Sequence, residues 1–327
     1  MAHQSDKWQH TMARYLGLSL DTSFSFGILP GVCRESMCRR DWIYTDPECY
    51  DTKKTYSWSR KHHEKIDKTR FMESYYGTAP FLWDLAKIAT EEVYEPKGSL
   101  FYIPRDDQVT IRCDDITNVQ DAIDWAPRPI RFLLPWRKCD LWKEWDKLRL
   151  PEGSEFVQMI DRETRQFTLS RLLLQSEHVY IPWPGTDIYY AEFLNKNIHM
   201  YDKLEYYRTK DMAEMEEGTY NLKLLNYLKW GWDYLNDKQK EFFSWTNNWS
   251  QIAEDDRKFL TQKMLGLDAL KSPQQLYDDL QRLNYLTPDQ IRVSDDYQTA
   301  YEWLREKTIK FANIKCSERC SVMYDTI

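Results

Sequence analysis

A Gly-Thr turn, Gly185-Thr186, is the feature of this chain that points most directly to chemistry. It follows a short apolar run at 178–183, which predicts a strand, and it precedes a helical spacing of apolar residues at 188, 191 and 194. Open α/β sheets bind ligands at the carboxyl ends of their strands, and a helix N-terminus offers backbone N–H groups to phosphate. Asp187 suits the helix dipole but would repel a phosphate. The turn therefore predicts a diphosphate contact, with an ordinary strand–helix connection as the alternative.

Further polar residues extend this predicted binding edge. Ser170 and Arg171 lie on the helix predicted before the strand, and Arg137 and Lys138 follow a strand predicted at 129–136. Glu192, further along the next helix, could reach a ribose. Arginine, lysine and hydroxyl groups can offset the charge of a leaving diphosphate. The alternatives are a solvated basic loop for Arg137 and Lys138, and a surface position for Glu192.

A second group of residues could supply acid–base chemistry. Asp106 and Asp107 follow the strand predicted at 99–104, where a carboxylate could take the proton of an attacking hydroxyl. Arg105 precedes them as a further substrate-binding candidate, and His62 and His63 are the other possible bases. A carboxylate pair can also hold a divalent metal on a diphosphate. This alternative is less favoured, because the residues around Asp106 and Asp107 do not show the flanking pattern that such a metal site requires. We therefore expect no cofactor and a metal-independent site.

The elements that must position these residues alternate along the middle of the chain. Strands and helices follow one another from about 99 to 202, which predicts a doubly wound, mostly parallel sheet of the α/β class. An amphipathic helix is predicted at 78–94, and Ser272-Pro273 with Gln275 predicts a capping box. We expect three regions: a partly irregular N-terminal region (1–98) in which residues 1–70 are irregular and polar, an α/β nucleotide-binding-like lobe (99–204) and a helical C-terminal region (205–327) that ends in a tail from 316.

Composition limits the possible classes of protein. The chain has 327 residues, 30% of them charged, a net charge of −7 and a mean hydropathy of −0.73. The acidic balance disfavours broad nucleic-acid binding, although a local basic cleft could allow it. No run is long enough to span a bilayer, and the first residues lack a signal-peptide core. The cysteines are odd in number and scattered, which favours reduced thiols over a disulfide framework. Together these features predict a cytoplasmic protein.

Several common nucleotide-binding and catalytic motifs are missing from the sequence. We find no P-loop, no dinucleotide-binding glycine motif, no nucleophile elbow and no zinc-protease motif, and the chain has only 10 glycines. Kinase-like and dehydrogenase-like binding is therefore disfavoured. His178 stands directly before the apolar strand run and is predicted to be structural.

Four ordered segments carry a resemblance to a known family. The segments are Gly77 with 79–82, the run 98–104, the set Ser176, Val179, 185–188, 190–191, 196 and 198, and the run 265–276. In this order the chain resembles bacterial and phage GT-B-type glycosyltransferase-like proteins of surface-polysaccharide pathways. The resemblance implies a Rossmann-like nucleotide lobe that holds a nucleotide sugar. The chain departs from the family at Arg105-Asp106-Asp107, where the family often has His-Ser, and its N-terminal part is short for a full nucleotide-fold lobe.

The first hypothesis is therefore a glycosyltransferase that moves a sugar from a nucleotide-sugar donor to an unknown acceptor. One alternative is a non-catalytic binding or assembly protein that keeps a GT-B-like lobe. Another is a glycosyltransferase acting on modified DNA bases, which the negative charge of the chain disfavours.

Overall fold

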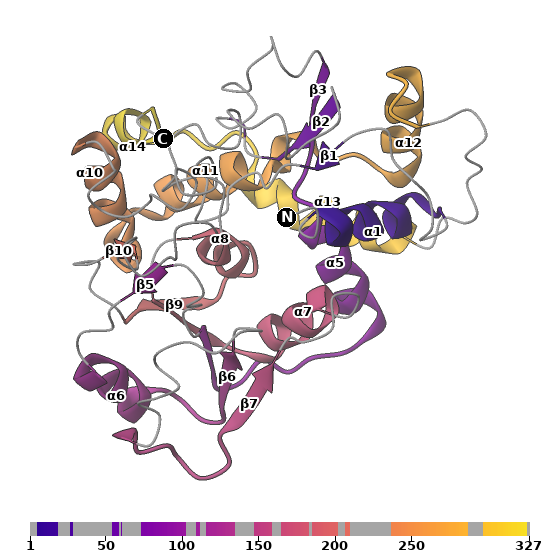
Figure 1. Cartoon of the computed structure of the whole chain (residues 1–327). Helices are drawn as coiled ribbons and strands as arrows, with labels where there is room; N and C mark the ends of the chain where they lie inside the picture. The colour runs from indigo at the N-terminus through magenta and orange to yellow at the C-terminus, as the bar shows by residue number, and fades with distance from the viewer. Residues whose placement is uncertain are drawn as a thin grey trace, which may run out of the picture.

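The computed structural model describes residues 5–18, 27–28, 54–58, 60, 73–102, 109–111, 116–134, 147–158, 165–182, 185–201, 207–209, 237–286 and 297–325. It contains a parallel five-stranded sheet, which lies in the lower part of the view in Figure 1. Its strands, in spatial order, are β7 (Glu155–Gln158), β6 (Ile130–Leu134), β4 (Ser99–Tyr102), β8 (His178–Ile181) and β9 (Asn197–Met200). All four pairings are parallel. The predicted α/β class and parallel sheet are confirmed.

The order of the strands reverses once. Numbered along the chain, the five strands stand in the order third, second, first, fourth, fifth. Within this sheet β4 is the first strand in sequence. The chain then forms β6 and β7 on one side of β4, and afterwards β8 and β9 on the other side. The switch point therefore lies between β4 and β8, and in open α/β sheets the ligand crevice lies outside the carboxyl ends of the strands at that point.

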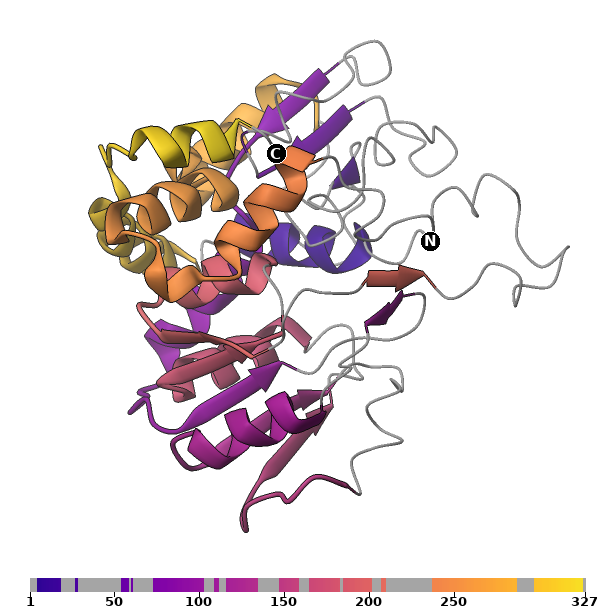
Figure 2. The same ribbon diagram turned by 90° about the vertical axis from the view of Figure 1, so that its left-hand side faces the viewer.

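Helices cover both faces of the sheet. Figure 2 shows α6 (Ile116–Trp125) against the face turned toward the viewer, where Val119 and Ile123 pack on Phe101 and Phe132. The opposite face packs against α7 (Arg165–Gln175) and α8 (Thr186–Phe193), through residues such as Leu100. Alternate residues of each strand face opposite sides of a sheet, which accounts for the split of the core into two clusters.

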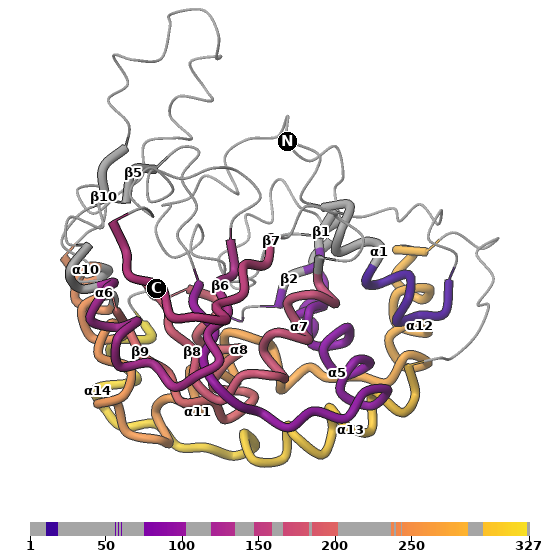
Figure 3. Tube along the Cα trace, turned by 90° about the horizontal axis from the view of Figure 1, so that it is seen from below, coloured from indigo at the N-terminus to yellow at the C-terminus, as the bar shows by residue number. Residues whose placement is uncertain are grey.

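The larger core cluster joins all three predicted regions. It includes residues of α1 (Ser5–Leu16) and α5 (Phe81–Glu91), of the sheet, and of α11 (Glu254–Leu265), α12 (Pro273–Arg282) and α13 (Gln298–Thr308). Figure 3 shows α1, α5 and α13 side by side. A second parallel sheet contains β1 (Gly27–Ile28), β2 (Lys54–Ser57) and β3 (Glu73–Tyr76), and a two-stranded antiparallel sheet contains β5 (Val109–Ile111) and β10 (Tyr207–Thr209).

The C-terminal third is helical where the structure describes it. It contains α10 (Asp237–Thr246), α11, α12 and α13, with 3₁₀ helices η7 (Trp249–Gln251), η8 (Leu267–Ala269) and η9 (Ile309–Phe311) between them. The capping box predicted at Ser272 and Gln275 is confirmed. Gly266 ends α11 with φ +61°, and a Cβ there would lie 2.3 Å from the carbonyl oxygen of Gly77. None of the described helices is long and apolar enough to cross a membrane.

Two expectations about the ends of the chain are wrong. The predicted tail forms a helix, α14 (Glu318–Tyr324), because Ser317 caps it and because Cys320, Met323 and Tyr324 are buried. The N-terminal part is not irregular throughout, since α1 forms there and buries Met12 and other apolar residues. Both helices are short, and both are held by packing on distant parts of the chain, which local sequence does not reveal.

Candidate functional site

The switch point of the five-stranded sheet is built from the ends of two neighbouring strands. Tyr102 is the last residue of β4, and Ile181 is the last residue of β8. Gly185 then caps α8, which begins at Thr186. Gly185 has an extended backbone conformation at this position (φ −150°, ψ −170°). The Gly-Thr turn predicted from sequence is therefore placed beside the first strand of the series.

Two buried hydroxyl groups at this point lack partners. The Oη of Tyr102 and the Oγ1 of Thr186 are shielded from solvent and have no hydrogen-bond partner among the described residues. Tyr102 as a whole is 8% exposed. A buried hydroxyl without a partner costs free energy, so polar groups of this kind are normally satisfied in a working protein. Among the described residues, both hydroxyls therefore keep an unused capacity for hydrogen bonding.

The electrostatics of the site favour hydroxyl groups as partners. Burial first, and the neighbouring Asp187 second, raise the pKa of Tyr102 well above its ordinary value, so its hydroxyl stays protonated and can donate. Asp187 stands in the first turn of α8, where the carboxylate suits the helix dipole. A carboxylate accepts hydrogen bonds from sugar or ribose hydroxyls but repels a phosphate at close range. The charge of Asp187 therefore makes the start of α8 unfavourable for a phosphate.

Two of the residues predicted to bind substrate are engaged in contacts within the fold. The hydroxyl of Ser170 donates to the carbonyl oxygen of Gln166 at 2.8 Å, one helical turn earlier. Arg171 donates to Glu92 at 2.9 and 2.7 Å on the surface between α7 and the end of α5. Neither of these contacts reaches the switch point. Their roles in binding stay predictions.

Glu192 is also held inside the protein. Its carboxylate accepts from the indole of Trp249 at 2.9 Å and from Arg257 at 3.1 Å, and the residue is 8% exposed. The alternative that Glu192 is a surface residue is wrong, because its side chain is buried. Its hydrogen bonds to Trp249 and Arg257 join α8 to η7 and α11. A ribose contact would have to compete with both donors.

The remaining candidates lie outside the described residues. These are the predicted catalytic pair Asp106 and Asp107, the binding residues Arg105, Arg137 and Lys138, and His62 and His63. Among the described residues, no group of three His, Cys, Asp or Glu side chains could hold a metal ion. The comparisons with protein-family models, curated proteins and solved structures give no match.

Sequence reasoning missed Tyr102 as a site residue. It was included only as part of the strand 99–104, although it ends the first strand of the alternating series. The signal in the sequence is the position of Tyr102 at the end of the first strand of the series. In a sheet of this strand order, the first strand borders the switch point. The lack of a partner for its hydroxyl is visible only in the folded protein.

Proposed function

We propose that the protein binds a nucleotide sugar at the switch point between β4 and β8, and that it transfers the sugar to an acceptor hydroxyl. One observation carries the proposal: two buried hydroxyls without partners, on Tyr102 and Thr186, lie where the strand order reverses. The adjacent Asp187 accepts hydrogen bonds from sugar or ribose hydroxyls. The resemblance of the sequence to GT-B-type glycosyltransferases supports the same reaction class.

The transfer requires three tasks of the protein. A base must take the proton of the acceptor hydroxyl as its oxygen bonds to the anomeric carbon, and the bond from that carbon to the diphosphate oxygen breaks. Positive groups and helix N–H groups must stabilise the leaving diphosphate. Asp106 or Asp107 is the proposed base, and Arg105, Arg137 and Lys138 are the proposed positive groups. Tyr102 and Thr186 orient the donor by binding its hydroxyls.

A binding experiment tests the proposal. The purified chain is titrated calorimetrically with UDP, GDP, CDP and ADP and with their common nucleotide sugars. For the ligand that binds, we expect Tyr102→Phe and Thr186→Val each to weaken binding about tenfold, the value of one lost hydrogen bond of about 1.4 kcal/mol. A nucleotide sugar should bind more tightly than its free nucleotide, because the hydroxyls contact the sugar.

The chain offers matched controls. Tyr189 and Thr261 also carry buried hydroxyls without partners among the described residues, but Tyr189 lies near Cys320 and Thr261 lies on α11. Tyr189→Phe and Thr261→Val should leave binding unchanged. Failure of every nucleotide and nucleotide sugar to bind would overturn the proposal. Tight binding without transfer or hydrolysis of the donor would support the non-catalytic binding protein instead.

A further inference from the structure

A row of aromatic rings crosses the face of the sheet that α6 covers. Each of the five strands contributes one ring, and the five residues are paired directly in register: Phe156, Phe132, Phe101, Tyr180 and His199. Neighbouring ring centroids are 5.2, 5.3, 4.2 and 4.5 Å apart along the row. We call this row the aromatic ladder. Neighbouring rings pack against one another and restrict each other's orientation, so the ladder presents a rigid, mainly apolar surface.

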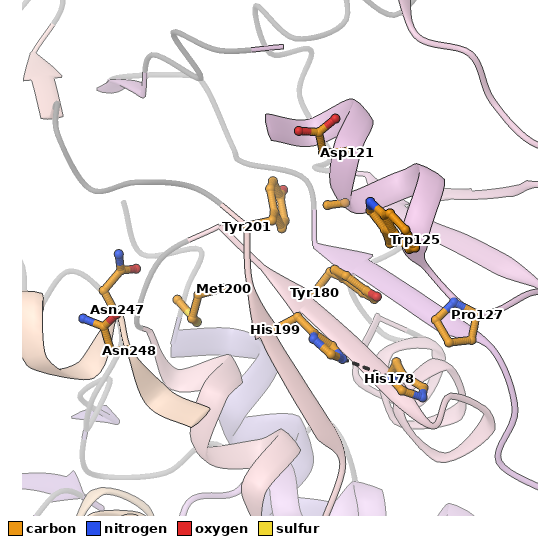
Figure 4. A pocket seen from close by; sticks show the side chains of 11 residues that line it. Asp121, Trp125, Pro127, His178, Tyr180, His199, Met200, Tyr201, Asn247 and Asn248 are labelled. Atoms are coloured by element: carbon orange, nitrogen blue, oxygen red, sulfur yellow. Dashed lines mark hydrogen bonds between the residues drawn. The ribbon is translucent and has the colours of Figure 1, made fainter. Parts of the chain in front are cut away.

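The covering helix leaves the β8–β9 end of the ladder open. Val119 and Ile123 of α6 pack over the middle rings, while a cavity of about 620 Å³ lies over Tyr180 and His199 (Figure 4). Trp125, the last residue of α6, stands at this cavity and is 86% exposed. Trp58, Trp83 and Trp249 are all buried. A large exposed aromatic ring at the rim of a concave site of this volume is typical of ligand binding.

Polar groups line the same cavity. The amides of Asn247 and Asn248 stand on one side and the carboxylate of Asp121 on the other (Figure 4). The Oδ1 atom of Asn247 is buried and has no hydrogen-bond partner among the described residues. The other amide is engaged, because Asn248 donates to the carbonyl oxygen of Ser244 at 2.9 Å. Asn247 is therefore ready to accept a hydrogen bond from a ligand.

Two histidines form the remaining polar side of the cavity. Nδ1 of His178 and Nε2 of His199 are 2.9 Å apart, so one nitrogen donates and the other accepts. Burial first, and His178 second, lower the pKa of His199, which favours the neutral form of the His199 imidazole. None of the described residues that line the cavity is a lysine or an arginine. The site therefore suits an uncharged ligand better than a phosphate-bearing one.

We propose that this cavity is a binding site for a neutral saccharide. A sugar ring has apolar C–H faces, which pack on an exposed ring such as Trp125, and hydroxyl edges, which exchange hydrogen bonds with amide, carboxylate and imidazole groups. The Oδ1 of Asn247, which has no partner among the described residues, accepts one sugar hydroxyl. The cavity lies on the other face of the sheet from the Tyr102 side chain: Tyr180 belongs to the core cluster under α6, and Tyr102 belongs to the opposite one. Tyr201, which also lines the cavity, touches only the backbone of Tyr102, since its hydroxyl donates to that carbonyl oxygen at 2.6 Å. The saccharide site therefore does not depend on the proposed transferase activity.

Defined oligosaccharides test this proposal. The full chain is screened on immobilised glucose, galactose, mannose and N-acetylglucosamine oligomers, and the best binder is titrated free in solution against the wild type and variants. Trp125→Ala and Asn247→Ala should each weaken its binding about tenfold, the effect of losing one stacking or hydrogen-bonding group. Trp125 is exposed, so its replacement should leave the unfolding temperature unchanged, which a thermal scan verifies.

The other end of the aromatic ladder provides the matched control. Phe156 is 49% exposed at the far edge of the sheet, and Phe156→Ala removes an aromatic ring without touching the cavity. It should leave saccharide binding unchanged. Absence of binding to every oligosaccharide, or equal binding by wild type and Trp125→Ala, would overturn the proposal. Preferential binding of adenosine or uridine would overturn it as well, since the site would then be a nucleobase site. A failure of nucleotide sugars at the switch point would not affect this outcome.

Discussion

At the scale of single residues, the core contains one carboxylate that depends on its partners. Asp84 has no solvent exposure, and it accepts hydrogen bonds from Arg14 at 2.8 Å, Thr11 at 2.8 Å and Tyr297 at 3.2 Å. These partners come from α1, at the start of the described chain, and from the start of α13, more than 280 residues later. A buried charge is tolerated only when it is paired in this way.

Removing the positive partner should be costly. In Arg14→Met the carboxylate keeps two hydroxyl donors but loses its ion-pair partner, so we expect the free energy of unfolding to fall by about 3 kcal/mol. The exposed pair between Arg149 and Asp124 gives the matched control, because Arg149→Met should cost less than about 1 kcal/mol. Urea unfolding measures both. Equal effects of the two substitutions would show that the buried pair is not needed.

At the scale of elements, much of the architecture could be predicted from sequence. The strands and helices between 99 and 202 follow from apolar runs and helical spacing, and Ser272-Pro273 marks the start of α12. The order of the strands could not be predicted, because it depends on contacts far apart in sequence. For the same reason the aromatic ladder was missed: its five residues stand in five strands, and only the register brings them into one row.

Contacts far apart in sequence also account for α14, where the sequence alone predicts a tail. The hydroxyl of Ser317 accepts from the amide of Cys320 at 3.1 Å and donates to Asp256 at 2.7 Å, so the cap works only when α11 is present. We expect Ser317→Ala to lower the free energy of unfolding by about 1–2 kcal/mol, because both hydrogen bonds are lost.

Urea unfolding with a control on the same helix measures this cap. Ser321 is exposed on the same helix, so Ser321→Ala should have little effect or stabilise slightly through helix propensity. If Ser317→Ala were as stable as Ser321→Ala, the cap and its link to Asp256 would contribute nothing to holding α14.

At the scale of the whole molecule, the α/β lobe depends on the helices around it. The faces of α7 and α8 that turn away from the sheet pack on α5 and α11. Phe81 of α5 lies 4.3 Å from Tyr190 of α8, measured between ring centroids, and Glu192 binds Trp249 at 2.9 Å. The predicted lobe at 99–204 therefore leaves out the helices that cover it, because α5 precedes it in sequence and α11 follows it.

A fragment of residues 99–204 should not fold on its own. Without α5 and α11, it would expose apolar side chains of α7 and α8, such as Leu173, Ile188 and Phe193, which have no solvent exposure in the full chain. Burial of each such side chain contributes about 1.5–3 kcal/mol, and a domain is stable by only about 5–15 kcal/mol in total. We expect the fragment to lack near-ultraviolet circular dichroism and to bind a hydrophobic dye, while the full chain unfolds in one transition seen alike by circular dichroism and tryptophan fluorescence. A fragment that melts cooperatively with a native-like spectrum would show instead that the sheet is an autonomous domain, and that the helices pack on it without being needed to form it.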